Sequence, residues 1–486
     1  MQSKTCFGLI VALFVIESVW IAISSSYPMA FDEDFHFGII KLYAAQWSPF
    51  FAHQPAHANA FGALTSDPSY LYHYLMSFPY RLISLWTSYQ PTQIVCLRLI
   101  DVALVACSLV WFRALLLRTK ASSALVNAAL LFFVLIPVLP LLAGQINYDD
   151  LLLPLAALAM LTGLDVRQQL LARRVPVGRL LKLGAICMFA SLVQFEFLPI
   201  FAAIAAYVGW QIWRLRRAAE KNHRWQTAWQ VTGRFYRLAA VAVFLVALGL
   251  FGQRYGTNLV AYKTPVPQCN QVLTVSQCAA YTPWFRNYSD ALQKTSVNLN
   301  PLHYSVTWAY GMFEHSFFIS SSGANPNAMY IHISPLPIIA GTAAVIFGGG
   351  MLLLVCRPRR TRALLRQHQP LGFLLFISAV YCAVLWLWNF HDYVNLGAAV
   401  ALNGRYLLPV MPPVMLAIGL AYRQWLGNRL NLKAGLLVIA FLLFLQGGGA
   451  LTFIEASNAN WYWSQSALPR TLNSTAQKIV KPLIIT

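Results

Sequence analysis

The sequence predicts an all-α polytopic membrane protein with about eleven membrane-spanning helices. Hydrophobic residues make up 58% of the 486 positions and charged residues only 10%, and the mean hydropathy is +0.57. A soluble domain carries roughly 25% charged residues, so this composition excludes one. The net charge of +20 does not indicate a nucleic-acid partner, because most Lys and Arg residues lie in short loops between apolar runs.

Apolar runs near the length of a membrane span, about 20 residues, recur along the whole chain. They lie near residues 7–24, 93–112, 122–142, 151–165, 183–195, 197–213, 236–252, 335–356, 371–388, 405–421 and 434–454. No small-residue cleavage site follows the first run, so we expect it to form the first helix and to act as a signal anchor.

The basic residues predict the orientation of these helices. Clusters of Lys and Arg follow the second, fourth, sixth, eighth and tenth runs, whereas the alternate loops hold few basic residues and nearly all the acids. The positive-inside rule therefore places the N-terminus in the cytoplasm. We expect a single membrane domain, 1–486, with the C-terminal tail, 456–486, on the outer side.

Two of the outer segments are long. In the first, 25–92, the stretches 35–50 and 70–86 mix aromatic with polar residues and are too amphipathic to span. They are typical of helices that lie in the membrane interface. The second segment, 253–334, is rich in prolines and aromatics and predicts a small extracytoplasmic cap.

Six of the eight cysteines lie in or beside apolar runs, but Cys269 and Cys278 both lie in the cap segment. If the cap faces an oxidising compartment, these two can form a disulfide. The alternative is a pair of free thiols.

The strongest local signal is the acidic run Asp32-Glu33-Asp34, shortly after the first predicted helix. Three consecutive carboxylates repel one another, and at a membrane surface they favour a site that meets a cation, a metal or a substrate hydroxyl. A solvated turn is the alternative interpretation.

Other outer turns bring polar residues to the same predicted face. Asp149 and Asp150 lie between the third and fourth runs, Glu196 lies between the fifth and sixth, and Arg405 and Tyr406 begin the tenth. The alternative interpretation is that short turns are often polar, which would explain the polar residues of each turn taken alone. Together they predict one polar site on the outer face.

Charges also occur within the predicted spans, at Glu17, Arg98 and Asp101. An unpaired charge there costs about 2.5–3.5 kcal/mol on insertion scales, so we expect them to pair. Glu17 is the expected partner of Arg98, and Asp101 is the competing one.

This arrangement resembles the GT-C superfamily of integral-membrane glycosyltransferases. The run Asp32-Glu33-Asp34 after a first helix is similar to the DxD, DE or ExD motif of that superfamily. The segment from Asp67 to Tyr70 and the run from Gly404 to Pro409 are also similar to features of its bacterial members.

The resemblance implies a polyprenyl-phosphate sugar donor and direct, inverting transfer to an envelope glycan, such as lipopolysaccharide, or to a lipid acceptor. It places the protein in a bacterial inner membrane, with membrane lipids around it and the active site facing the periplasm. Asp32 or Asp34 would be the general base, with Glu33 orienting the acceptor or the base. Arg405 would balance the charge of the departing lipid phosphate.

The remaining candidates have secondary roles under this resemblance. His36, His73, Arg81 and Tyr406 are further substrate-binding candidates. Asp149, Asp150 and Glu196 would bind sugar hydroxyls or a divalent cation. No cofactor is certain from the sequence, and the need for a metal stays open.

Two rival functions stay open. A transporter or flippase usually places its polar groups near the membrane midplane on broken helices and has repeated halves. Here the polar residues lie at the outer helix ends and the chain has no repeat, although Pro137, Pro140 and Gly348 would suit broken helices. A lipid-linked glycan polymerase shares both the substrates and the polytopic fold.

Overall fold

The protein is described by a computed structural model that covers residues 3–29, 31–219, 226–228, 234–294, 299–317, 337–427, 435, 463 and 466–480. Across these residues the fold is all-α apart from one short pair of parallel strands, β1 (Arg174–Pro176) and β2 (Gln226–Ala228). Arg174 of β1 pairs with Gln226 of β2. The all-α prediction is confirmed.

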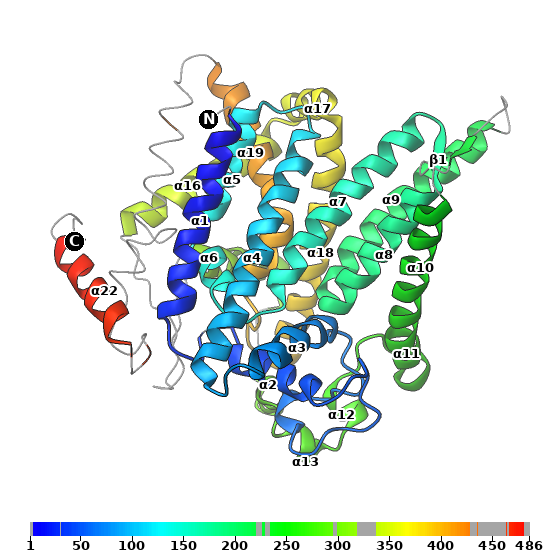
Figure 1. Cartoon of the computed structure of the whole chain (residues 1–486). Helices are drawn as coiled ribbons and strands as arrows, with labels where there is room; N and C mark the ends of the chain where they lie inside the picture. Colours follow the sequence, from blue (N-terminus) through cyan, green and yellow to red (C-terminus); the bar gives the residue numbers. More distant parts are fainter. Residues whose placement is uncertain are drawn as a thin grey trace.

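Most of the helices form an upright bundle (Figure 1). Its helices are α1 (Lys4–Ser24), α4 (Gln90–Leu117), α5 (Ser123–Val134), α6 (Val138–Ala143), α7 (Asp149–Leu171), α8 (Val177–Val193), α9 (Leu198–Ala219), α10 (Arg234–Phe251), α16 (Pro337–Cys356), α18 (Gln369–Leu396) and α19 (Met411–Leu426).

Shorter elements lie at the ends and sides of this bundle. They are α2 (Glu33–Ala44), α3 (Leu71–Ser84), α11 (Thr257–Tyr262), α12 (Cys269–Val272), α13 (Val275–Cys278), α14 (Thr282–Leu292), α15 (Pro301–Phe317), α17 (Pro358–Gln367) and α22 (Ala467–Val480). Short segments of other helix types are η1 (Asn59–Phe61), η2 (Phe195–Phe197), η3 (Gly252–Gly256) and η4 (Gly404–Val410).

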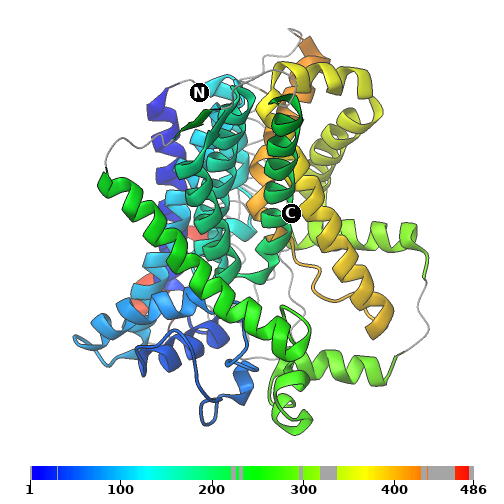
Figure 2. The ribbon, with the colours of Figure 1, turned by 90° about the vertical axis from the view of Figure 1, so that its right-hand side faces the viewer.

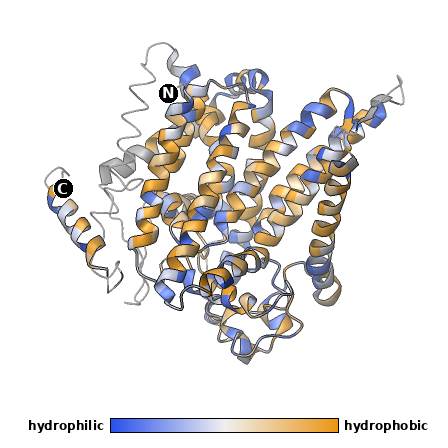
Figure 3. Ribbon diagram, viewed as in Figure 1, coloured by the Kyte–Doolittle hydropathy of each residue, from blue (hydrophilic) through white to orange (hydrophobic). Residues whose placement is uncertain are grey.

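Six helices of the described chain are long and apolar enough to cross a membrane. They cover Lys4–Ser24, Gln90–Leu117, Phe195–Arg217, Phe235–Tyr262, Gln369–Leu396 and Gly404–Trp425. Figure 3 shows that apolar residues dominate these bundle helices, and side chains such as Leu9 and Ile16 of α1 are 67% and 69% exposed. An apolar outer surface of this kind supports a multi-pass membrane protein.

The other predicted runs form helices whose bounds differ from the prediction, or they lie partly outside the described residues. The run 122–142 is divided into α5 and α6 around Pro137, because a proline removes a helix donor and its ring clashes with the preceding turn. The run 151–165 belongs to α7, which starts with two aspartates, and 183–195 falls within and just beyond α8. The run 434–454 lies outside the described residues except for position 435.

The small helices α2, α3, α12 and α13 gather at one end of the bundle, the lower end in Figure 1. We call this the loop end. Helices α2 and α3 confirm a helix in each of the predicted stretches 35–50 and 70–86, although α2 ends at Ala44 and residues 45–50 form turns and bends. Helix α10 packs against α8 and continues through η3 into α11 near the cap, as Figure 2 shows from the side.

A disulfide joins Cys269 and Cys278 in the cap, with their sulfur atoms 2.08 Å apart. This is the pairing expected from their position in the cap segment. The bond connects the one-turn helices α12 and α13, and both cysteines are buried.

Candidate functional site

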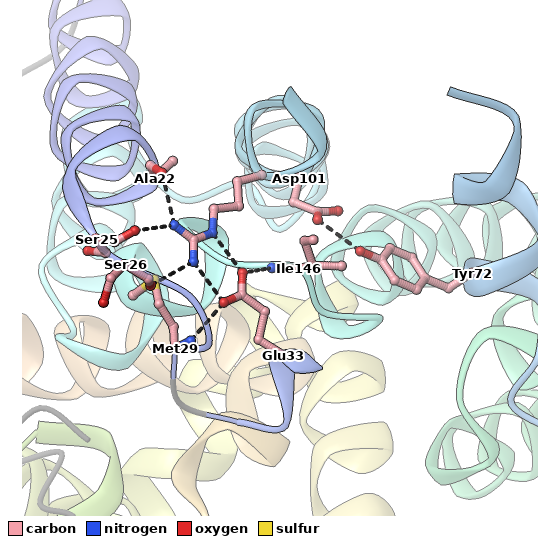
Figure 4. Close-up of polar contacts among 9 residues, drawn as sticks. Ala22, Ser25, Ser26, Met29, Glu33, Tyr72, Asp101 and Ile146 are labelled. Atoms are coloured by element: carbon pink, nitrogen blue, oxygen red, sulfur yellow. Dashed lines mark hydrogen bonds and ion pairs between the residues drawn. The ribbon is translucent and has the colours of Figure 1, made fainter. Parts of the chain in front are cut away.

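The acidic run is anchored by a buried ion pair between Glu33 and Arg98 (Figure 4). Arg98 Nε donates to Glu33 Oε1 and Arg98 Nη2 donates to Glu33 Oε2, both at 2.7 Å. Both side chains are 0% exposed. Two parallel charge-assisted hydrogen bonds of this kind fix direction as well as distance.

The other hydrogen bonds of this pair reach separate parts of the chain. Arg98 Nη1 donates to the carbonyls of Ala22 at 3.1 Å and Ser25 at 2.6 Å, so it satisfies the end of α1. The Glu33 carboxylate accepts from the backbone N–H groups of Met29 at 2.7 Å and Ile146 at 3.1 Å. The pair therefore connects α1, the first loop, α4 and the turn before α7.

The expected Glu17–Arg98 pair is wrong. Helices α1 and α4 run in opposite directions, and a helical side chain leans toward the N-terminus of its own helix. Arg98 therefore leans toward the loop end, whereas Glu17 leans away from it. Asp101 instead accepts a hydrogen bond from Tyr72 Oη at 2.8 Å, and Glu17 has no hydrogen bond or ion pair within the described part of the chain.

The turn before α2 adopts an uncommon backbone conformation. Phe31 and Asp32 have φ values of 59° and 63°, in the left-handed region, which costs roughly 1–2 kcal/mol for each non-glycine residue. Asn147 Nδ2 donates to the Phe31 carbonyl at 3.1 Å and helps to hold this turn. Strained turns of this type cluster at functional sites. Here the turn presents an Asp32 side chain that is 65% exposed.

Arg405 lies between the carboxylates of two distant segments. Its Nη2 is 4.0 Å from Asp32 Oδ2, and its Nε is 3.7 Å from Asp149 Oδ2. Nη2 also donates to Tyr406 Oη at 3.4 Å. The Nε group is buried and has no hydrogen-bond partner among the described residues, so the guanidinium has unused donor capacity.

The position of Arg405 depends on its neighbour Gly404. A Cβ at this glycine would clash with Met312 and Ser316 of α15, so the close packing of η4 on α15 requires a residue without a side chain.

The other acids of the outer turns are placed differently. Glu196 accepts from Gln194 Nε2 at 3.1 Å and lies within electrostatic range of Asp149 and Arg405. Asp150 is 0% exposed and is oriented inward, within electrostatic range of Asp101. Of these acids, only Asp149 forms an ion pair with the Arg405 guanidinium, whereas Glu196 and Asp150 lie within its electrostatic range.

His36 and His73 form a buried pair between α2 and α3. His36 Nδ1 and His73 Nε2 share a hydrogen bond of 2.9 Å, and the two rings stack with centroids 5.2 Å apart. Burial lowers the pKa of both imidazoles, that of His73 to about 3. Both rings are therefore neutral near pH 7, with one N–H donating across the pair.

Arg81 lies in the last turn of α3, and its side chain binds the backbone at the C-terminal end of α2. Its guanidinium donates to the carbonyls of Tyr43 at 2.8 Å and Ala44 at 3.0 Å, and also to that of Gln46. It also lies 4.1 Å from the centre of the Trp47 ring. These contacts stabilise the loop after α2.

A cavity of about 210 Å³ lies between the first loop and the cap. Its aromatic walls include Phe35 and Tyr281, whose rings stack with centroids 5.8 Å apart. Asp67 and His73 also face it, and burial raises the pKa of the Asp67 carboxyl above its usual range.

Sequence reasoning did not select Asp67, Tyr148 or Tyr281 as site residues, although all three line this cavity. The available signals were the resemblance of the segment from Asp67 to Tyr70 to bacterial GT-C members, the place of Tyr148 directly before Asp149, and the position of Tyr281 three residues after a cap cysteine.

Among the residues that the structure describes, no group of three or more His, Cys, Asp or Glu side chains could hold a metal ion. A divalent cation at this site would need ligands from a substrate or from other parts of the chain.

Taken together, fold and site define a multi-pass membrane protein with a polar site and a cavity at one end of its helical bundle. No protein-family model matches the chain, and no curated protein matches it.

The ion pair generates a prediction about stability. Replacing Glu33 with Gln leaves the Arg98 charge buried without its partner, so we expect the protein to lose about 3–5 kcal/mol of stability. Thermal unfolding of the purified protein in detergent measures this loss. Glu17→Gln is the matched control, since it removes a buried carboxylate that has no ion pair within the described chain; equal melting of the two variants would contradict the anchoring role.

The histidine pair generates a prediction about pH. The native rings resist protonation, so as the pH falls below about 6.5 the unfolded state takes up protons that the native state does not. Stability should therefore decrease on acidification, by up to about 1.4 kcal/mol per pH unit for His73 alone. His73→Gln should flatten this dependence in melting curves from pH 7 to pH 4. The exposed His57, on the same loop, provides the control His57→Gln, and an unchanged slope in His73→Gln would refute the assignment.

Proposed function

We propose that this protein is an inverting glycosyltransferase of the GT-C type. It would transfer a sugar from a polyprenyl-phosphate donor to an envelope glycan or lipid acceptor at the periplasmic face of a bacterial inner membrane. One observation carries the proposal. An exposed carboxylate, Asp32, lies 4.0 Å from the buried guanidinium of Arg405, at the same end of the bundle as an aromatic-lined cavity.

Asp32 is the residue that we assign as general base. Of the three acids in the motif, Glu33 forms the buried ion pair with Arg98, whereas Asp32 and Asp34 are exposed. Asp32 alone of these two has an ion pair within the described chain, and its left-handed turn directs it to Arg405. The acceptor hydroxyl oxygen attacks the anomeric carbon as its proton passes to Asp32. The bond from that carbon to the donor phosphate oxygen breaks, and the lipid phosphate departs with the electron pair.

Arg405 would stabilise the departing phosphate. A guanidinium binds phosphate oxygens through paired hydrogen bonds, and the buried Nε of Arg405 has no such partner among the described residues. Asp149, at 3.7 Å, and Tyr406 Oη, at 3.4 Å, keep the guanidinium in position. In this proposal Glu33 is a positioning residue, because it acts through the turn that carries Asp32.

The cavity beneath the cap would accommodate the transferred sugar. Aromatic rings such as Phe35 and Tyr281 can pack on the apolar face of a sugar, while Asp67 and Ser69 can hydrogen-bond its hydroxyls. The distribution of charge supports the orientation, since the clusters of Lys and Arg lie at the opposite, predicted cytoplasmic, loops.

The test is a transfer assay with purified protein in nanodiscs, radiolabelled polyprenyl-phosphate sugars and a crude envelope-glycan acceptor. Loss of a general base lowers the rate about 10²–10⁴-fold, which is the effect expected for Asp32→Asn. Asp34→Asn is the matched control, with the same change two residues away on an exposed side chain, and it should keep most of the activity.

Two results would count against the proposal. The first is an Asp32→Asn variant that keeps full activity. The second is the absence of transfer from every donor by the wild-type protein, after which the transporter and polymerase functions would take precedence.

A further inference from the structure

A second cavity, of about 450 Å³, lies at the opposite end of the bundle from Asp32 and Arg405. Four cationic side chains and one carboxylate line it: Arg118, Lys120, Arg167, Arg366 and Asp165. These residues come from the end of α4 and the turn after it, from α7 and from α17. Figure 1 shows α17 at the end away from the small helices of the loop end.

The cavity holds more cationic side chains than the described protein groups pair with. Arg118 forms an ion pair with Asp165 at 3.2 Å, and Arg167 Nε donates to Tyr207 Oη at 2.9 Å. Lys120 and Arg366 are exposed, and within the described ranges neither side chain has a hydrogen bond or an ion pair. The cavity is therefore a site of uncompensated positive charge.

The walls of the cavity are held together by a specific contact. His368, at the junction of α17 and α18, hydrogen-bonds through Nδ1 to the backbone carbonyl of Thr119 at 2.9 Å. This bond fixes the turn after α4 against the start of α18. Both α4 and α18 are long and apolar enough to span a membrane, so their ends, and hence the cavity, would lie at a bilayer surface.

We propose that this cavity binds the phosphate of an anionic phospholipid headgroup. Lys and Arg side chains are the groups that recognise phosphate, and basic pockets between helices at a membrane surface bind lipid headgroups. A free phosphate would meet the same cations. The lining also includes Leu117, Leu164 and Leu171, which suit the apolar part of a lipid and favour the lipid as the occupant. This assignment is independent of the glycosyltransferase proposal.

The test measures binding of a fluorescent short-chain phosphatidylglycerol to the full-length protein in neutral detergent. Each removed cation weakens such an interaction by about fivefold, so Lys120→Gln/Arg366→Gln should bind ~25-fold more weakly than wild type. The control is Arg359→Gln/Arg362→Gln, which removes two exposed charges of α17 that do not line the cavity. It should stay within about twofold of wild type, because these two charges do not line the cavity and salt screens their effect on a headgroup bound there.

The outcomes separate the possible occupants. Weakened binding in the cavity variant alone, with little displacement by millimolar inorganic phosphate, supports the lipid site. Efficient displacement by inorganic phosphate assigns the cavity to a free phosphate and overturns the lipid assignment. Equal weakening in both double variants, or no weakening in either, overturns the site itself.

Discussion

The buried ion pair between Arg98 and Glu33 is the constraint on which the loop end of the protein depends. All five N–H groups of the guanidinium donate hydrogen bonds, and the carboxylate accepts from two backbone N–H groups as well. Two buried charges are stable in an apolar bundle only when they are paired and hydrogen-bonded in this complete way. The pair thereby fixes the end of α1, the start of α2 and the turn before α7 relative to one another.

This arrangement explains how neighbouring acids can serve different purposes. Glu33 points into the bundle, and the left-handed turn at Phe31 and Asp32 directs the adjacent carboxylate outward to Arg405. The turn before α7 is held by Glu33 through Ile146 and carries Asp149 to the other side of the same guanidinium. The stabilising ion pair and the proposed reaction site thus share one segment of chain. The Glu33–Arg98 pair determines where the carboxylates of Asp32 and Asp149 lie.

Composition and periodicity were sufficient to predict the class of fold, because they depend on the bilayer and not on detailed packing. Amphipathic patterning also indicated the helices α2 and α3, and the place of two cysteines in one outer segment indicated the disulfide of the cap. The partner of Arg98 could not be predicted, because it depends on the opposite lean of side chains on antiparallel helices. The contacts of Arg81 and Asp150 could not be predicted either. Their charge can be read from the sequence, but their contacts depend on tertiary structure. The cavity beneath the cap is formed by segments about 200 residues apart, and no local pattern reveals it.

The most direct test of this account is hydrogen–deuterium exchange at the amides of Met29 and Ile146, which donate to Glu33. We predict that both amides are protected in the wild-type protein and that Arg98→Met releases both together. The helical amides of α8, which lie outside this network, should keep their protection in the same variant. Retained protection at Met29 and Ile146 in Arg98→Met would contradict the central role of the ion pair.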